Sequence, residues 1–360
     1  MNLTELGWNP FFREQFEPYQ AQGYVPARIV CAEKQLYDVL SEVGELTAQV
    51  SGKFRHQSAS DGDFPVVGDW VAIQPYLKEA KATIHRILPR KSKVSRKVSS
   101  GAERRSGGIT EEQVIAANLD TVLIVTGLDR DFNLRRIERY LTFAYNSGAA
   151  PVIVLNKADM CAEVETRLVE VEAIAFGAPV HALSAKDQQG LDVLRQYLQV
   201  GKTAALVGSS GVGKSTLING LLGEERQRVN ALSDSTSKGQ HTTTRRELIV
   251  LPGGGMLIDN PGMRELQLWG DEENLQGSFA DIEALAAQCH FHDCRHAHEP
   301  GCVVRAALSQ GVLDQQRFQS YLKLQKELLY LEKRRGQSAR VIEKERWKQI
   351  AKSQRIFYKA

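Results

Sequence analysis

A glycine-rich segment at 208–216 has the residue types and the spacing of a phosphate-binding loop. It consists of Gly, four residues, Gly, Lys and Ser, and an apolar run at 204–207 precedes it. Glycines let backbone N–H groups turn toward an anion, and the helix expected from Lys214 adds positive potential. Lys214 would reach the β- and γ-phosphates as a catalytic cation, and the Ser215 hydroxyl would bind Mg²⁺. The predicted phosphate contacts are Gly208, Ser209, Ser210, Gly211, Val212, Gly213, Lys214, Ser215 and Thr216.

A second polar segment directly follows the apolar run at 151–155 and has the residues to recognise guanine. Asp159 can accept hydrogen bonds from N1–H and N2–H₂ of guanine, a pair of donors that adenine lacks. Asn156 suits the other edge of the base, and the Lys157 stem can lie across its face. The backbone of 184–186 can donate to guanine O6. The predicted base-binding residues are Asn156, Lys157, Ala158, Asp159, Ser184, Ala185 and Lys186.

Either base-reading segment alone is weak evidence, since an ordinary polar turn has the same composition. Both segments follow apolar runs that predict strands, and ligands of open α/β sheets gather at the carboxyl ends of strands. Beside a phosphate loop, they therefore predict a guanine nucleotide, GTP or GDP, rather than an adenine nucleotide.

The residues that follow the phosphate loop are typical of nucleotide-sensing switches. Asp259 ends an apolar run and can hold Mg²⁺ through water, and Gly262 lets the backbone respond to the γ-phosphate. One threonine of 242–244, with Thr243 among the candidates, would complete the Mg²⁺ shell. Many GTPases place a water-orienting Gln where Met263 stands. We therefore hypothesise that His241 positions or deprotonates the attacking water; the alternative is that it only helps to fold its loop.

Three of the five cysteines, Cys289, Cys294 and Cys302, lie within one short segment beside several histidines. In a protein of the reducing cytosol, such a group indicates a metal rather than a disulfide. Three thiolates and one imidazole form a closed tetrahedral site, which is structural rather than catalytic. The composition predicts one Zn²⁺, and the alternative is free reduced cysteines. The competing imidazoles are those of His290, His292, His296 and His298.

The elements around these motifs predict a multidomain protein with a central α/β sheet. Short β-like runs separated by turns predict a small barrel of the oligonucleotide-binding (OB) type at 27–94. Apolar strands that alternate with helices from residue 119 predict a parallel sheet with helices on each side. The expected domains are an extended arm at 1–26, the barrel at 27–94, a basic linker at 95–118, the α/β nucleotide-binding domain at 119–276, a helical metal-binding module at 277–335 and a basic helical tail at 336–360.

The charge is unevenly distributed along the chain. The net charge is +3, but the segment from Arg317 to the end carries 13 lysines and arginines against 4 acidic residues. A basic tail on an acidic body indicates a polyanionic partner or, more simply, a solvated helix. No apolar run approaches the length of a membrane span, and the first residues do not resemble a signal peptide. We therefore expect a cytoplasmic protein with no membrane partner.

The order of the motifs along the chain differs from that of the usual GTPase and resembles that of a known group of GTPases. In the usual GTPase the phosphate loop comes first and the base reader last, whereas here 156–159 and 184–186 precede 208–216. This is the order of circularly permuted GTPases. With a barrel in front and a Cys/His segment behind, the chain resembles the RsgA (YjeQ/EngC) family of ribosome small subunit-dependent GTPases over about residues 25–335. The supporting segments are 112–118, Gly239–Thr244 and Glu299–Cys302.

The resemblance implies a GTPase with P-loop architecture that hydrolyses GTP to GDP and phosphate with Mg²⁺. It implies stimulation by the small (30S) ribosomal subunit, binding to rRNA, a role in late subunit maturation and release on hydrolysis. It also favours His296 as the fourth zinc ligand and supports the role given to His241. We expect a monomer. The alternatives are a GTP-dependent regulatory switch with a protein or membrane-surface partner and, less well supported, a small-molecule kinase.

Overall fold

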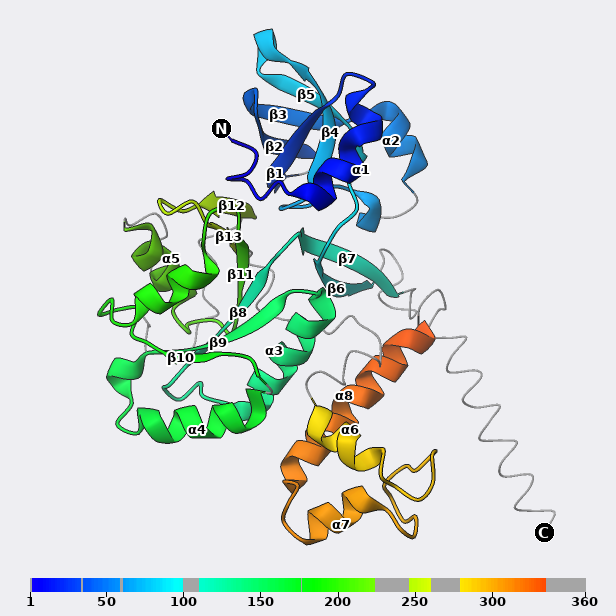
Figure 1. Ribbon diagram of the computed structural model, residues 1–360, viewed down its shortest axis with the longest axis vertical. Helices are drawn as coiled ribbons and strands as arrows, with labels where there is room; N and C mark the ends of the chain where they lie inside the picture. The colour runs from blue at the N-terminus through cyan, green and yellow to red at the C-terminus, as the bar shows by residue number, and fades with distance from the viewer. Residues whose placement is uncertain are drawn as a thin grey trace, which may run out of the picture. The chain divides into compact units, whose positions relative to one another are not determined.

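The computed structural model describes residues 2–33, 35–58, 61–99, 110–175, 177–223, 246–259 and 279–334 (Figure 1). The chain divides into two compact units, the first formed by Met1–Val94 and Val114–Leu266 and the second by Ser95–Gln113 and Gln267–Ala360. Among the helices in these described ranges, none is both long enough and apolar enough to cross a bilayer.

The first part of unit one is a closed five-stranded barrel. Its strands follow the order β1-β2-β3-β5-β4, and β4 pairs back onto β1 to close the barrel. Alternate residues of each strand, such as Ile29, Val39 and Ile84, are fully buried in its core. The short helix α2 (Gly52–Gln57) adds Phe54 to that core. The strands are β1 (Val25–Glu33), β2 (Leu36–Ser41), β3 (Gly44–Val50), β4 (Trp70–Tyr76) and β5 (Lys81–Ile87). The expected β-barrel is confirmed.

The segment before the barrel is helical where we expected an extended arm. Helix α1 spans Pro10–Gln20. Pro10 occupies the first helical turn, where its fixed φ favours helix initiation, and the Asn9 side chain caps the helix by accepting from Phe11 N at 3.1 Å. Phe12 and Phe16, one turn apart, are buried near Trp70. Pro10 thus starts a helix, and Pro18 lies within it.

The rest of unit one is an α/β domain whose sheet is continuous with the barrel through a short β1–β12 pairing at Cys31 and Glu247. Its strand order is β10-β9-β8-β11-β13-β12, and all neighbours are parallel except β12 and β13. The strands are β8 (Thr121–Gly127), β9 (Ala150–Asn156), β10 (Val180–Ala182), β11 (Thr203–Val207), β12 (Glu247–Val250) and β13 (Met256–Asp259).

Helices cover this sheet because its central strands are apolar on both faces. Helices α3 and α4 pack together beside β8, β9 and β10 (Figure 1). Leucines of α5 share a core with alternate residues of β8, β9 and β11. The helices are α3 (Leu134–Ser147), α4 (Val164–Ala175) and α5 (Lys214–Leu222). The segment Leu191–Tyr197 forms a 3₁₀ helix, which the left-handed Gly190 precedes.

The expected basic linker contains two paired strands, β6 (Lys93–Ser99) and β7 (Thr110–Ala117). The prediction weighed the charges of this segment and gave too little weight to the apolar residues of β7, from Val114 to Ala117, which are buried. In the described part of unit two, helices precede and follow the Cys/His segment. They are α6 (Ala280–Ala286), α7 (Val303–Ser309) and α8 (Gln315–Arg334). Arg317 of α8 is bonded to both carboxylate oxygens of Asp281 at 2.9 and 3.0 Å.

Candidate functional site

The glycine-rich loop connects β11 to α5, as its sequence predicted. Three of its glycines have positive φ, at 151° for Gly208, 80° for Gly211 and 96° for Gly213. A Cβ on Gly208 would lie 2.1 Å from the carbonyl oxygen of Val125, so only glycine fits between the loop and β8. The sequence therefore places a tightly curved backbone at the start of α5, where N–H groups can bind phosphate.

The Lys214 ammonium lies within this loop. Its Nζ donates to the carbonyl oxygens of Gly208 at 2.7 Å and Ser209 at 2.5 Å. These bonds hold the cation beside the backbone that would surround a phosphate. Ser215 and Thr216 follow in the first turn of α5 and are half-buried.

The two predicted guanine-binding segments, 156–159 and 184–186, meet at the carboxyl edge of the sheet. Strands β9 and β10 are parallel, with Leu155 opposite Ala182, so the residues after each strand are neighbours. The Ser184 hydroxyl donates to Asp159 Oδ1 at 2.7 Å. Ser184 is buried whereas Asp159 is exposed. The hydroxyl thus orients a carboxylate that faces outward, where it can accept hydrogen bonds from a base.

The Asn156 side chain joins its own base-reading segment to the 184–186 segment and to the phosphate loop. Its Nδ2 donates to the Val212 carbonyl at 2.7 Å, and its Oδ1 accepts from Ala185 N at 2.9 Å. The side chain is buried, and a Cβ on Gly213 would lie 2.3 Å from Nδ2. We expected Asn156 to meet an edge of the base. In the structure both ends of its amide bond to the protein, so the side chain holds three segments together.

Of the predicted magnesium and switch residues, the structure describes Ser215 and Asp259. Asp259 ends β13, next to β11, and is half-buried. Burial raises the pKa of Asp259, and the positive charge of Lys214 opposes this rise. A carboxylate that loses solvation near a phosphate loop has the chemistry to bind a hard cation. The remaining predicted residues of the switches, His241, Thr243 and Gly262, lie outside the described residues.

Sequence reasoning missed a group of side chains on the loop that follows β8. Asp129 is bonded to Lys157 of the base reader, with 2.6 Å between Oδ2 and Nζ. Arg136 of α3 contacts both Asp131, at 2.5 Å, and the Ser209 hydroxyl of the phosphate loop. A signal was available: these acidic residues follow an apolar strand at the same sheet edge as the predicted site residues.

The four predicted zinc ligands come together in unit two. Their ligand atoms, three Sγ and one imidazole nitrogen, lie within 4.8 Å of one another. His296 Nδ1 is 3.7 Å from Cys289 Sγ and 3.5 Å from Cys302 Sγ, and the two sulfurs are 3.9 Å apart. Tetrahedral Zn²⁺, with Zn–S of about 2.3 Å and Zn–N of about 2.0 Å, needs ligand atoms about 3.5–3.8 Å apart. The residues therefore fit zinc.

The protein around the Cys/His group favours the ligand protonation states that a metal requires. Burial lowers the pKa of His296, so its imidazole is neutral at physiological pH. Partial burial would raise the pKa of Cys289, but backbone N–H groups of Val304 and Val303 at the start of α7 bring it below its usual range. Desolvation raises the pKa of Cys294 to about 11. Bound zinc would hold it as the thiolate.

Glu299 shapes the loop that presents His296. Its carboxylate accepts hydrogen bonds from the backbone N–H groups of Arg295, Ala297 and His298 at 2.8–3.2 Å. Backbone hydrogen bonding, including its own N–H, lowers the pKa of Glu299 to about 2. His296 itself has a positive φ of 59°, which is unusual for a residue with a side chain. The carboxylate thus stabilises a strained turn on both sides of the candidate metal ligand His296.

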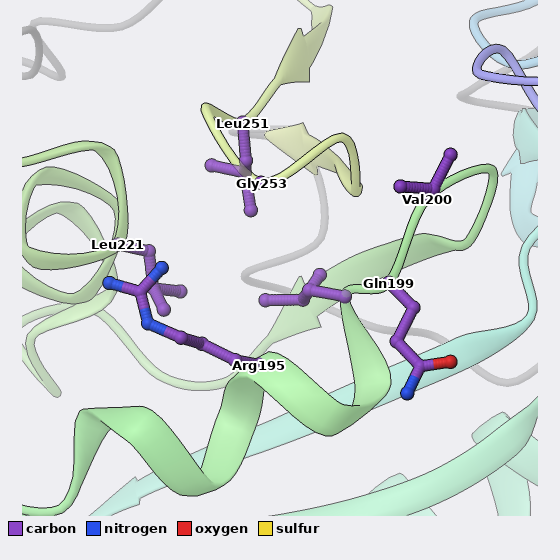
Figure 2. Close-up of a pocket in the computed structure, with 7 residues that line it drawn as sticks. Arg195, Gln199, Val200, Leu221, Leu251 and Gly253 are labelled. Carbon is purple, nitrogen blue, oxygen red and sulfur yellow. The ribbon is translucent and has the colours of Figure 1, made fainter.

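A separate cavity of about 250 Å³ lies away from these residues (Figure 2). Its lining includes the apolar side chains of Leu221, at the end of α5, and Leu251, after β12, and the charged side chain of Arg195. None of its lining residues belongs to the predicted nucleotide or metal sites. The candidate functional site is therefore the sheet edge formed by the phosphate loop and base reader.

Comparison with known proteins agrees with this geometry. The RsgA GTPase family model matches residues 87–269. The "Small ribosomal subunit biogenesis GTPase RsgA" of Opitutus terrae is 47% identical over 99% of this chain and 97% of its own length. The protein of the same name from Syntrophotalea carbinolica is 46% identical over 97% of this chain and 96% of its own.

Two crystal structures share the architecture. YjeQ from Thermotoga maritima has a TM-score of 0.63 and 28% identity, and the match covers 85% of this chain and 99% of that one. YloQ, described as a circularly permuted GTPase, has a TM-score of 0.59 and 25% identity over 85% and 95% of the two chains. The circularly permuted order predicted from the motifs is confirmed, and the chain belongs to the RsgA GTPase family.

Proposed function

We propose that this protein is a GTPase that binds its nucleotide at the edge of the β8–β11 sheet and acts in biogenesis of the small ribosomal subunit. The observation that carries the nucleotide site is the Asn156 amide, which bonds to Val212 at 2.7 Å and Ala185 at 2.9 Å. These bonds join the phosphate loop to both base-reading segments, which supports one shared nucleotide site. The names of the relatives, small ribosomal subunit biogenesis GTPases, support the ribosomal role.

The residues then have distinct tasks. Asp159, oriented by Ser184, accepts hydrogen bonds from N1–H and N2–H₂ of guanine. Lys214 exchanges its carbonyl partners for the β- and γ-phosphates. Ser215 and Asp259 would hold Mg²⁺, which would neutralise charge on the phosphates. Thr243 and Gly262 complete the switch side of the site.

Hydrolysis needs a group that orients water, and Met263 cannot supply one. We assign this role to His241. Replacement of His241 by Ala should lower GTP turnover by roughly 100-fold or more while GDP affinity stays unchanged. His56, which is exposed on α2 of the barrel, provides the matched control, and His56→Ala should leave turnover intact. Equal turnover by His241→Ala and the unmodified protein would remove His241 from the mechanism.

The small ribosomal subunit and its rRNA are the proposed partners, and the cytoplasm is the proposed location. The barrel and the basic C-terminal segment suit a phosphate backbone, while the zinc module would fix the shape of a second contact surface. We propose that the protein acts as a monomer, binds no membrane, and is released from a late maturation intermediate when GTP is hydrolysed.

GTP hydrolysis by the full chain, with and without purified small subunits, tests this function. We expect strong stimulation by small subunits and none by large subunits, with ATP as the nucleotide control. GTP hydrolysis that small subunits leave unchanged would contradict the ribosomal role. Stimulation by anionic vesicles instead would favour a membrane-associated switch.

A further inference from the structure

The 128–133 loop after β8 contacts both halves of the nucleotide site. On the base side, the Asp129 carboxylate lies 2.6 Å from the Lys157 ammonium, and both side chains are largely buried, at 20% and 16% exposure. On the phosphate side, Asp131 binds Arg136, whose guanidinium contacts the Ser209 hydroxyl. Tyr140, one turn further along α3, also bonds to the Ser209 side chain. Two acidic residues of one loop thus face the two recognition segments.

This loop is fixed in place by several independent contacts. Leu128 N donates to the Asn156 carbonyl at 2.8 Å, which ties the loop to the end of β9. The Phe132 ring packs under the Arg167 guanidinium of α4, at 4.9 Å. Asn133 caps α3 by accepting from Arg136 N at 3.0 Å. A loop anchored at both ends and in its middle can hold a side chain in one position.

The surroundings of Asp129 favour its ionised form beside Lys157. Burial would raise its pKa, but the Lys157 ammonium and the backbone N–H of Asp131 outweigh burial and leave the pKa below its usual range. A Cβ at Gly127 would lie 2.6 Å from Asp129 Oδ1 and 3.5 Å from Lys157 Cδ. The absence of a side chain at 127 therefore makes room for this ion pair.

Lys157 itself has a constrained backbone. Its φ is 65°, in the left-handed region that few residues with side chains occupy. A lysine stem has four rotatable bonds, and it loses much rotational freedom when it lies flat on a base. A carboxylate that holds the ammonium in advance removes part of that entropic cost before the nucleotide arrives.

From these contacts we propose that Asp129 is a positioning residue for guanine nucleotides, which holds Lys157 across the face of the base. Asp131 lies in the same 128–133 segment and binds Arg136, which contacts the phosphate loop. The 128–133 segment therefore connects base recognition to phosphate recognition. This inference rests on the proposed nucleotide site. It adds to that site a group that touches no part of the nucleotide in our account and acts through Lys157.

A double-mutant cycle in GDP affinity tests the inference. We expect Asp129→Ala and Lys157→Met each to weaken GDP binding about tenfold, and the double variant to be no weaker than Lys157→Met alone. Asp192→Asn removes an exposed carboxylate that pairs with Arg195 at 3.1 Å far from this loop, and it should leave GDP affinity unchanged. Independent, additive effects of Asp129→Ala and Lys157→Met would overturn the proposal.

Inorganic pyrophosphate provides a second readout, measured by its displacement of a fluorescent GDP analogue. It has no base, so Asp129→Ala should leave its affinity unchanged, whereas Arg136→Ala should weaken it. Equal losses of GDP and pyrophosphate affinity in Asp129→Ala would mean a general distortion of the site and would also overturn the proposal. If the unmodified protein binds no GDP, the proposed nucleotide site fails; if it does and Asp129→Ala binds equally well, only this inference fails.

Discussion

The metal-binding group and the nucleotide site differ in how the chain assembles them. The Cys₃His group comes from one short segment, and its four ligand atoms lie within 4.8 Å of one another. The nucleotide site comes from strand ends distant in the sequence, and its side chains bind one another, as Asn156 binds Val212. We therefore expect the Cys₃His group to depend on its metal ion for its structure, whereas the nucleotide site is organised by the fold of the sheet.

Removal of zinc is expected to have the largest effect. Binding of structural Zn²⁺ contributes roughly 10–16 kcal/mol in small zinc-binding peptides, as much as the whole stability of many domains. Cys302→Ser, or strong chelation, should therefore unfold the segment around α6 and α7. We expect about one zinc per chain by elemental analysis before treatment, and rapid proteolysis of this segment afterwards.

Two observations would contradict this contrast between the Cys₃His group and the nucleotide site. A zinc-free protein that keeps the segment resistant to protease would mean that packing, not metal, organises it. Loss of GDP binding by Cys302→Ser, measured with Mg²⁺ present, would mean that the nucleotide site is not organised by its own sheet. Cys161→Ser removes a cysteine outside the group and should have neither effect.

A methyl group at Gly213 should disrupt the nucleotide site while the fold persists. Its Cβ would lie 2.3 Å from Asn156 Nδ2, and φ there is 96°. Backbone strain and loss of the Asn156 bond together cost roughly 2–4 kcal/mol, so we expect GDP affinity to fall about 100-fold for Gly213→Ala in a calorimetric titration.

Gly223→Ala is the matched control for this substitution. Gly223 has a φ of 76° but no atom within 4 Å of its added Cβ. This variant should lose about 1 kcal/mol of stability, measured by denaturant unfolding, and bind GDP normally. Equal GDP affinities of the two variants would mean that the close approach of Asn156 to the phosphate loop has no role in binding.

Glu299→Gln should have a smaller effect, on the metal alone. The substitution keeps the size of the side chain but weakens the hydrogen bonds to the backbone around His296. Groups that orient metal ligands commonly contribute tenfold or more in affinity, so we expect about a tenfold loss of zinc affinity in a chelator competition assay. Asp293→Asn removes a neighbouring charge and should change affinity little. A similar loss in both variants would indicate a simple charge effect.

The sequence predicted what depends on local spacing. The turn of the phosphate loop follows from its glycines, and the convergence of Asp159 and Ser184 follows from two apolar runs that had to be parallel strands. The grouping of Cys289 with Cys302 also follows from short sequence separation.

What the sequence did not predict depends on long-range packing. Arg136 meets Ser209 because α3 crosses the edge of the sheet beside the phosphate loop, and no local pattern encodes that crossing. The burial of both ends of the Asn156 amide depends on two loops, at Ala185 and Val212, which lie 29 and 56 residues away in the sequence. Helix α1, where we expected an extended arm, depends instead on a local signal, the position of Pro10 in the first helical turn.

Nucleotide titration of the unmodified protein and of Asp159→Asn is the most direct test of the account, whose central claim is one guanine-specific site. Asn would donate to the C2 carbonyl of xanthine where Asp accepts from the guanine amino group. We predict that the unmodified protein binds GDP at least about 100-fold more tightly than ADP, and that Asp159→Asn loses about 100-fold for GDP while gaining affinity for xanthosine diphosphate. Equal binding of GDP and ADP, or an Asp159→Asn variant that keeps its preference for GDP, would contradict the account.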